Sequence, residues 1–154
     1  MANRNEEYLL PDLFGALQKE RFALFSTVNA DTGAPFMNTV SWIFAPDEKT
    51  IRIAIDSRSK MIENINKNSF VSVAIFVAES TYTISGKARI AVERLEDVPL
   101  KASMIEITVT EVRDVMFYGS KIVKEPIHEK TYDRQAALKL DRQVMSALKK
   151  EISS

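Results

Sequence analysis

The stretch "IRIAIDSRSKMIENINKN" (residues 51–68) joins two kinds of periodicity, and it decides how the rest of the chain is interpreted. Its first part alternates, with Ile51, Ile53 and Ile55 on one face, which is typical of a β-strand. Residues 58–67 instead carry apolar side chains at helical spacing and predict a helix of two or three turns. A basic, hydroxyl-rich turn separates the two elements, and its residues are Ser57, Arg58, Ser59 and Lys60.

The sequence before this stretch predicts one helix and two strands. A leading amphipathic helix is expected over about residues 6–20, where leucine and phenylalanine recur at helical spacing. From Phe22 the period changes, and residues 22–44 predict two strands joined by a turn at 31–33. Together with the alternating strand, residues 22–55 are therefore expected to form a three-stranded antiparallel meander.

The sequence after the stretch predicts further strands and a final helix. Strands are expected at residues 69–76 and 80–93, and residues 102–119 supply one or two more. Gly86 lies inside the long second strand and indicates a bulge or a close backbone approach. The tail turns helical again at about 131–150.

The predicted fold is mainly β, with six or seven antiparallel strands and peripheral helices. Because little helix is available to cover so many strands, the sheet is expected to close into a small barrel. The length of 154 residues fits one ordinary domain. Residues 1–154 are therefore interpreted as a single domain, with the helices at about 6–20 and 131–150 at its ends.

Composition excludes several classes of protein. Lys plus Arg equals Asp plus Glu, 21 against 21, so no global basic field favours nucleic acid or an anionic membrane as partner. The chain has no cysteine, which excludes disulfides, thiol catalysis and cysteine metal sites. No apolar run approaches the length of a membrane span, and the N-terminus lacks the apolar stretch of a secretory signal. We therefore expect a cytoplasmic protein.

The usual catalytic motifs are also absent. The four glycines are too far apart to form a dinucleotide fingerprint or a phosphate-binding P-loop. His128 is the single histidine, and no elbow motif presents a serine to it, so a Ser-His-Asp triad is not predicted. It is expected to be a partly exposed loop residue after Pro126. No metal site and no catalytic side chain are predicted.

The basic turn is suited to an anion. A helix that begins near Ser57 to Ser59 leaves its first backbone N–H groups without intrahelical partners, and the helix dipole adds partial positive charge there. Arg58 can grip two phosphate oxygens at once, while Lys60 adds a point charge. The alternative is a plain N-cap whose charged neighbours are solvated.

The order of these parts resembles the pyridoxamine 5'-phosphate oxidase-like family, the FMN-binding split barrels. The resemblance covers about residues 10–120: a leading helix, a strand pair holding "GAPFMNTVSW", a third strand, and then the basic turn that opens a helix. That helix ends at Asn68 before "SFVSVAIF", and the next strand carries "ISGKA" (84–88), which is similar to the family's apolar-x-Gly-Lys/Arg-Ala segment.

The resemblance implies a cofactor, an assembly and a set of binding residues. It implies a homodimer with FMN at the subunit interface, and an FMN phosphate held by Ser57, Arg58, Ser59 and Lys60. It also implies that the isoalloxazine ring and ribityl chain lie along the strand residues Asn38, Thr39, Val40, Ser41 and Trp42, with Thr81 contributing from the long strand. Alternatives stay open, because Val40 and Trp42 share one predicted strand face and could be core, and the polar residues could be ordinary strand residues.

The sequence also departs from the family's type enzyme. No basic residue stands near Asn38, and the tail is an amphipathic helix where the true oxidase carries an Arg and His segment that holds its product. Oxidation of pyridoxamine phosphate is therefore not predicted. The predicted function is an FMN-dependent oxidoreductase acting on an unidentified small molecule. A flavin-binding protein without turnover, a cofactor-free interaction module, and a haem or deazaflavin binder on the same barrel remain the alternatives.

Overall fold

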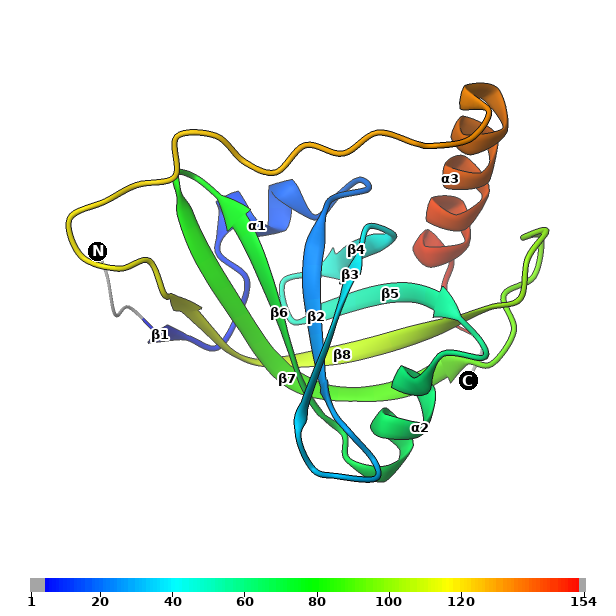
Figure 1. The fold of residues 1–154 in the computed structure, drawn as a ribbon, viewed down its shortest axis with the longest axis horizontal. Coiled ribbons are helices and arrows are strands. Elements are labelled where there is room, and N and C mark those ends of the chain that lie inside the picture. The colour runs from blue at the N-terminus through cyan, green and yellow to red at the C-terminus, as the bar shows by residue number, and fades with distance from the viewer. Residues whose placement is uncertain (1–4, 153–154) are drawn as a thin grey trace.

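One antiparallel sheet forms the body of the protein, whose computed structural model describes residues 5–152 (Figure 1). Its strands are β1 (Asn5–Glu6), β2 (Ala23–Val28), β3 (Pro35–Val40), β4 (Ile43–Asp47), β5 (Thr50–Asp56), β6 (Phe70–Val77), β7 (Ser80–Val92) and β8 (Ala102–Asp114). The hydrogen-bonded order is β3-β2-β6-β7-β8-β5-β4, and β1 pairs with β8 outside this path. The predicted mainly β fold is confirmed.

Two residues, Ser41 and Trp42, close the sheet into a barrel. They join β3 to β4, which stand at the two ends of the hydrogen-bonded order. The carbonyl of Ser41 accepts a hydrogen bond from Arg21 N at 3.0 Å, and that of Trp42 accepts one from Ala54 N at 3.0 Å. The middle strand of the predicted meander is therefore bent here into two strands, β3 and β4. Before the bend, β3 pairs with β2, and after the bend, β4 pairs with β5.

The helices are α1 (Pro11–Ala16), α2 (Lys60–Lys67) and α3 (Arg134–Lys149). The last two agree with prediction, and Asp133 caps α3 by accepting Ala136 N at 2.9 Å. The leading helix predicted at 6–20 is wrong in extent. Residues 5–6 pair with β8 as a strand, and Leu9 N donates to Glu48 O at 2.7 Å, so the backbone before Pro11 is engaged in sheet-like contacts.

The alternating apolar residues fill the barrel, and α1 closes one of its ends. Leu9, Leu13 and Leu17 are each at most 1% exposed and pack into the same cluster as the strand side chains. The inward residues of three strands illustrate the alternation: Phe25 on β2, Ile51, Ile53 and Ile55 on β5, and Val71, Val73 and Ile75 on β6. Burial of this apolar surface is the main stabilising contribution to the fold.

A second apolar cluster lies outside the barrel, beneath α3. It joins Val144, Ala147 and Leu148 of α3 to side chains of β4, β5 and β8 such as Phe44 and Met104. Arg52 secures the end of the helix, because its Nη1 donates to Leu148 O and Lys150 O, both at 2.9 Å. The C-terminal helix is therefore packed as an integral part of the domain.

Gly86 sits where β7 and β8 approach closely. A Cβ atom at this position would lie 2.2 Å from Thr108 O, which is far inside van der Waals contact. The register between the two strands also shifts between Ser85 and Gly86. The predicted bulge and close approach are both confirmed.

An irregular segment, residues 115–133, connects β8 to α3, and we call it the strap. Residues 102–119 were predicted to supply one or two strands, and they form the single strand β8, which ends at Asp114. The chain then runs along one end of the barrel to reach α3 (Figure 1). The strap is tied to the barrel at several points, which include Val115 N to Thr81 O at 2.9 Å and Ile122 N to Glu79 O at 2.8 Å. Among residues 5–152, no helix is long and apolar enough to cross a membrane.

Candidate functional site

The two serines of the basic turn have partners within the protein. Ser59 is the N-cap of α2, and its hydroxyl accepts a hydrogen bond from Met61 N at 3.1 Å. Ser57 lies against the start of β8, where Ser103 Oγ donates to Ser57 Oγ at 2.9 Å. A capping role for Ser59, which the sequence left open as the alternative to phosphate binding, is therefore observed.

Asp56 binds Arg58 inside this turn. Its Oδ1 accepts hydrogen bonds from Arg58 N at 2.8 Å and Nε at 3.1 Å, and its Oδ2 accepts one from Nη2 at 3.0 Å. The side-chain hydrogen bond from Arg58, aided by the backbone one, lowers the pKa of Asp56 to about 2, and the same bond raises the pKa of Arg58. The Arg58 side chain is nevertheless 79% exposed. Asp56 thus supplies an internal anion that the sequence interpretation overlooked.

Lys60 connects the turn to the β2–β3 loop. Its Nζ donates to Asp31 Oδ2 at 2.6 Å and to Glu63 Oε2 at 2.7 Å. These two hydrogen bonds raise the pKa of Lys60, chiefly the one to Asp31. The start of α2 is thereby held next to the loop that leads into β3, so the predicted phosphate anchor and the beginning of the predicted ring-binding strand are neighbours.

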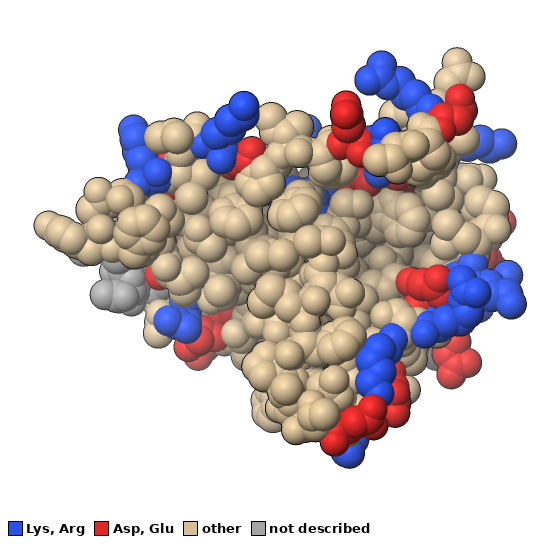
Figure 2. Space-filling model, in the orientation of Figure 1, with Lys and Arg blue, Asp and Glu red and all other residues tan. Residues whose placement is uncertain are grey.

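The turn is more balanced in charge than its sequence suggests. Two cations, Arg58 and Lys60, face three carboxylates, from Asp31, Asp56 and Glu63. Figure 2 shows Lys and Arg atoms interleaved with Asp and Glu atoms at the α2 end of the molecule. The turn also occupies backbone amides that were expected to be free: Met61 N bonds Ser59 Oγ, Arg58 N bonds Asp56 Oδ1, and Ser59 N bonds Asp56 O. A phosphate would have to replace the carboxylates as the partner of these cations.

A cavity of about 620 Å³ opens beside the turn. It lies between α2 and the strands β7 and β8, and its polar lining is Ser57, Asn66, Arg89, Glu93 and Ser103. Ser57 is the one predicted site residue among its lining residues. The turn thus borders a hollow that offers two hydroxyl groups, one amide, one guanidinium and one carboxylate.

The predicted ring-binding strand has an open edge. In the described part of the chain, β3 pairs with β2 alone, so the backbone groups along its other edge are not used by the sheet. Asn38 and Thr39 are exposed, and Val40 is half-buried against the barrel core. Ser41 Oγ donates to Glu20 Oε2 at 2.9 Å. Asn38 and Thr39 are therefore the members of this set whose side chains are accessible.

Trp42 points into a different environment from Val40. The sequence places both on one strand face, but the bend at residues 41–42 separates them, so this expectation is wrong. Trp42 packs with the cluster beneath α3, and its Nε1 donates to Asp141 Oδ1 at 2.9 Å. The sequence left open whether Trp42 packs in the core or contacts the flavin. Within a single chain, Trp42 packs against the cluster beneath α3.

Thr81 stands apart from the ring-binding strand. It lies at the start of β7, where its Oγ1 is 3.8 Å from Met116 Sδ, and β2 and β6 separate it from β3. Three inter-strand steps correspond to about 14 Å along the sheet. One chain does not bring Thr81 together with Asn38 and Thr39.

The outer surface of β3, β2, β6 and the start of β7 carries no charged side chain. We call it the uncharged sheet face, and the register places on it Leu24, Ser26, Val28, Pro35, Met37, Thr39, Ser72, Ala74, Phe76, Thr81, Thr83 and Ser85. It is bordered on β6 by Phe70, over whose ring Lys87 Nζ lies at 5.4 Å. Met37 is 60% exposed on this face. Figure 2 shows the corresponding surface as a broad area without Lys, Arg, Asp or Glu. An area without charged side chains can be buried against another protein surface without desolvating a charge.

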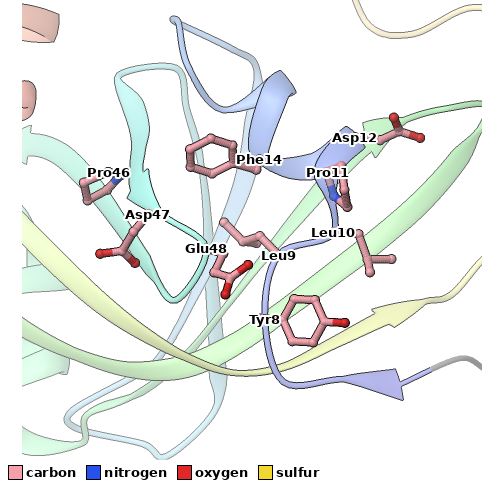
Figure 3. A pocket seen from close by; sticks show the side chains of 9 residues that line it. All are labelled: Tyr8, Leu9, Leu10, Pro11, Asp12, Phe14, Pro46, Asp47 and Glu48. Carbon is pink, nitrogen blue, oxygen red and sulfur yellow. The ribbon is translucent and has the colours of Figure 1, made fainter.

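A larger cavity lies elsewhere. It measures about 950 Å³ and is formed by the segment around α1 and the turn between β4 and β5 (Figure 3). Its lining combines apolar side chains such as Leu9, Leu10 and Phe14 with the acidic residues Asp12, Asp47 and Glu48. None of the predicted site residues lines it. Among residues 5–152, no group of three or more His, Asp or Glu side chains could hold a metal ion.

Sequence comparison identifies a family. The family model described as pyridoxamine 5'-phosphate oxidase matches residues 10–117, which include α1, the basic turn and β2 to β8. Among proteins with curated functions, none matches this sequence.

Solved structures share the fold at low sequence identity. A Lactobacillus delbrueckii protein described as a candidate pyridoxamine 5'-phosphate oxidase is 17% identical, with a TM-score of 0.58 over 73% of this chain and 98% of that chain. A protein described as an F420 reductase is 16% identical, with a TM-score of 0.51 over 64% of this chain and 93% of that chain. A haem-binding protein from Mycobacterium smegmatis is 16% identical, with a TM-score of 0.53 over 70% and 53%. At these identities the likeness shows the fold alone.

Proposed function

The chain belongs to the pyridoxamine 5'-phosphate oxidase-like family, and we propose that it is an FMN-binding flavoprotein that acts as an oxidoreductase on a small molecule. The match over residues 10–117 carries this proposal, because it covers both the basic turn and the open-edged strand β3. When bound, the flavin supplies the redox chemistry, so the protein has to bind and orient it. We assign no catalytic side chain.

In this proposal the phosphate binds at the basic turn. Arg58 is well exposed, and its planar guanidinium can exchange the Asp56 carboxylate for two phosphate oxygens. Lys60 can exchange Asp31 and Glu63 in the same way. Exposed ion pairs are weak because water screens them, which makes the exchange accessible. The hydroxyl of Ser57 or Ser59 would add a hydrogen bond.

The ring and ribityl chain would lie along β3. The free edge of this strand can donate and accept backbone hydrogen bonds, as the polar edge of an isoalloxazine requires. Asn38 and Thr39 would add side-chain contacts, while Val40, Ser41 and Trp42 would contribute backbone and packing. The Lys60–Asp31 hydrogen bond ties α2 to the loop before β3. One mononucleotide could therefore contact both the basic turn, through its phosphate, and β3, through its ring.

We further propose that the protein is a homodimer with the cofactor at the subunit interface. The uncharged sheet face supports this, since burying it against a second copy leaves no charged group of that face desolvated. The position of Thr81 also supports a homodimer. Within one chain, Thr81 lies about 14 Å along the sheet from β3, so the Thr81 hydroxyl that contacts the ring would come from the second copy.

One observation favours a second candidate, a cofactor-free interaction protein on the same barrel. The carboxylates of Asp31, Asp56 and Glu63 already satisfy the cations of the turn without any ligand. Such a protein would use the uncharged sheet face for association and the turn only to cap α2.

Cofactor titration separates the two candidates. The purified protein should be yellow, or should quench the fluorescence of added FMN with a saturable, one-to-one end point. F420 and haem serve as competitors in the same titration, because structures of similar fold are described as an F420 reductase and a haem-binding protein. Protein that is colourless and takes up no FMN would contradict the proposal. Bleaching of the bound flavin by NADH or NADPH without oxygen would support an oxidoreductase, whereas no bleaching by either donor would favour a passive flavin binder.

A further inference from the structure

A small cavity lies beneath the strap, at the end of the barrel. It measures about 240 Å³, and its lining includes Arg21, Phe22, Phe76, Glu125, Ile127 and His128. We infer that this cavity binds a small aromatic carboxylate as the substrate. In the protein without ligand, the Glu125 carboxylate occupies the position on Arg21 that the substrate's carboxylate would take. The inference rests on the proposed function, because it names the substrate class of that flavin site.

The cavity adjoins both strands predicted to contact the ring. Arg21 N donates to Ser41 O at 3.0 Å, which places the cavity at the end of β3. Phe76 is the register partner of Thr81, so the opposite wall continues into β7. A ligand in this cavity would therefore be next to a flavin that lies along β3.

The walls suit an aromatic ring. Phe22 and Phe76 are half-buried, and the rings of Phe22 and His128 lie 6.4 Å apart at an interplanar angle of 39°. Ile127 adds an aliphatic surface from the strap. This separation falls within the range of about 4.5–7 Å that aromatic pairs favour, so Phe22 and His128 already pack on each other and a planar ligand would add a further ring beside them.

The charged side chains that line the cavity are Glu20, Arg21 and Glu125. Glu20 Oε2 is engaged by Ser41 Oγ at 2.9 Å and by Lys130 Nζ at 2.8 Å, and Lys130 also donates to Asp141 Oδ1 at 3.1 Å. Arg21 remains as the cation, held in place by a hydrogen bond from Nη2 to Phe76 O at 2.5 Å. Its carboxylate partner is Glu125, whose side chain is 43% exposed and readily displaced into water.

Arg21 can accept a carboxylate in place of Glu125. In the described part of the chain, both side-chain hydrogen bonds of Arg21 come from Nη2, so Nε and Nη1 keep their donors, and displacement of Glu125 would free one N–H of Nη2 to act together with one of them. A guanidinium binds a carboxylate most strongly through two parallel hydrogen bonds. The group that Arg21 binds now is itself a carboxylate, which indicates this class of ligand in preference to a neutral one.

The size of the cavity limits the ligand to about one ring. Pockets for drug-sized ligands measure about 300–1,000 Å³, and this one lies below that range. The strap need not detach for exchange, because it is also tied on both sides of Glu125, by Lys121 to Glu79 at 3.2 Å and by Lys130 to Asp141 at 3.1 Å. Only the Glu125 side chain has to move.

The test measures binding of 4-fluorobenzoate, with 4-fluorobenzamide as the neutral analogue. Binding is followed by fluorine NMR and by the fluorescence of Trp42, the single tryptophan, whose neighbour Ser41 accepts the Arg21 amide. We expect E125Q to tighten 4-fluorobenzoate binding about threefold or more, R21Q to weaken it about tenfold or more, and the benzamide to bind at least about tenfold more weakly. E129Q, a change of another exposed strap carboxylate, should leave the affinity within about twofold.

The inference is overturned if E125Q leaves binding unchanged or weakens it, or if acid and amide bind equally. E125Q keeps the test valid even if R21Q fails to fold. The titration is made on flavin-free and on FMN-loaded protein. FMN uptake without 4-fluorobenzoate binding overturns this inference alone, while 4-fluorobenzoate binding without FMN uptake overturns the proposed flavin function and with it the role of the ligand as substrate.

Discussion

Asp56 holds the backbone and side chain of Arg58 through three hydrogen bonds of 2.8 to 3.1 Å, within the turn where a phosphate anchor is predicted. The sequence suggests a turn with an excess of positive charge, whereas in the structure carboxylates such as Asp56 neutralise its cations. If the turn binds phosphate, Asp56 competes with the ligand for Arg58. The competition makes the account testable residue by residue.

Replacing Asp56 by Asn should strengthen FMN binding by about threefold to tenfold. The substitution removes a competing carboxylate and leaves Arg58 free to bind phosphate. Quenching of FMN fluorescence measures the affinity, and E129Q is the matched control at an exposed site on the strap. Weaker FMN binding by D56N would show that Asp56 positions Arg58 for the ligand and does not compete with it.

The Asp56–Arg58 pair should also stabilise the fold in a pH-dependent way. Because the pKa of Asp56 is lowered to about 2 in the folded protein, its contribution is complete above the ordinary value near 3.8 and is lost as the pH falls toward 2. The difference in unfolding free energy between the parent protein and D56N should therefore shrink between about pH 4 and pH 2. A difference that stays constant over this range would contradict the assignment.

Asn64 should be needed to hold α2 against the barrel. It is fully buried, its Nδ2 donates to Thr27 Oγ1 at 3.0 Å, and its Oδ1 accepts Ala30 N at 2.8 Å. N64A leaves these groups without partners and should lower the free energy of unfolding by about 1–3 kcal/mol in a urea melt. N66A, at an exposed position of the same helix, should change it by less than about 0.5 kcal/mol. Equal effects of the two variants would contradict this role for Asn64.

A charge on the uncharged sheet face should dissociate the proposed homodimer. Met37 is 60% exposed on β3, the outermost strand of this face, so M37K would bury a lysine without a partner in the interface. Sedimentation velocity should show a dimer for the parent protein and a monomer for M37K. L138K, at an apolar side chain 48% exposed on α3, should remain dimeric. A dimeric M37K protein would place the interface elsewhere.

Local patterns predicted most of the fold. Alternation located the strands of the barrel, and Gly86 marked the one position where a side chain would collide with Thr108 O. The bend at Ser41 and Trp42 could not be predicted, because "NTVSWIF" has continuous strand character and the barrel's closure alone requires the break. The leading helix was overextended because the pairing of residues 5–6 with β8 depends on distant sequence.

The candidate site was predicted less completely. Residue types and order identified the basic turn, but Asp56, which directly precedes Ser57 in the sequence, was not recognised as a partner of Arg58. The pairing of Lys60 with Asp31 spans 29 residues, and that of Trp42 with Asp141 spans 99, so both depend on the three-dimensional fold. The same is true of the uncharged sheet face, which four strands build together.

The most direct test of the phosphate anchor compares FMN with riboflavin, which lacks the phosphate, on the parent protein and on the R58A/K60A double variant. We predict that the parent prefers FMN by about 100-fold and that the double variant retains less than about a tenfold preference, because two charge-assisted contacts are lost. An R134A/K139A variant, which removes two exposed cations of α3, should keep the parent's ratio. An unchanged ratio in R58A/K60A, or a parent protein that binds both flavins equally, would contradict the account.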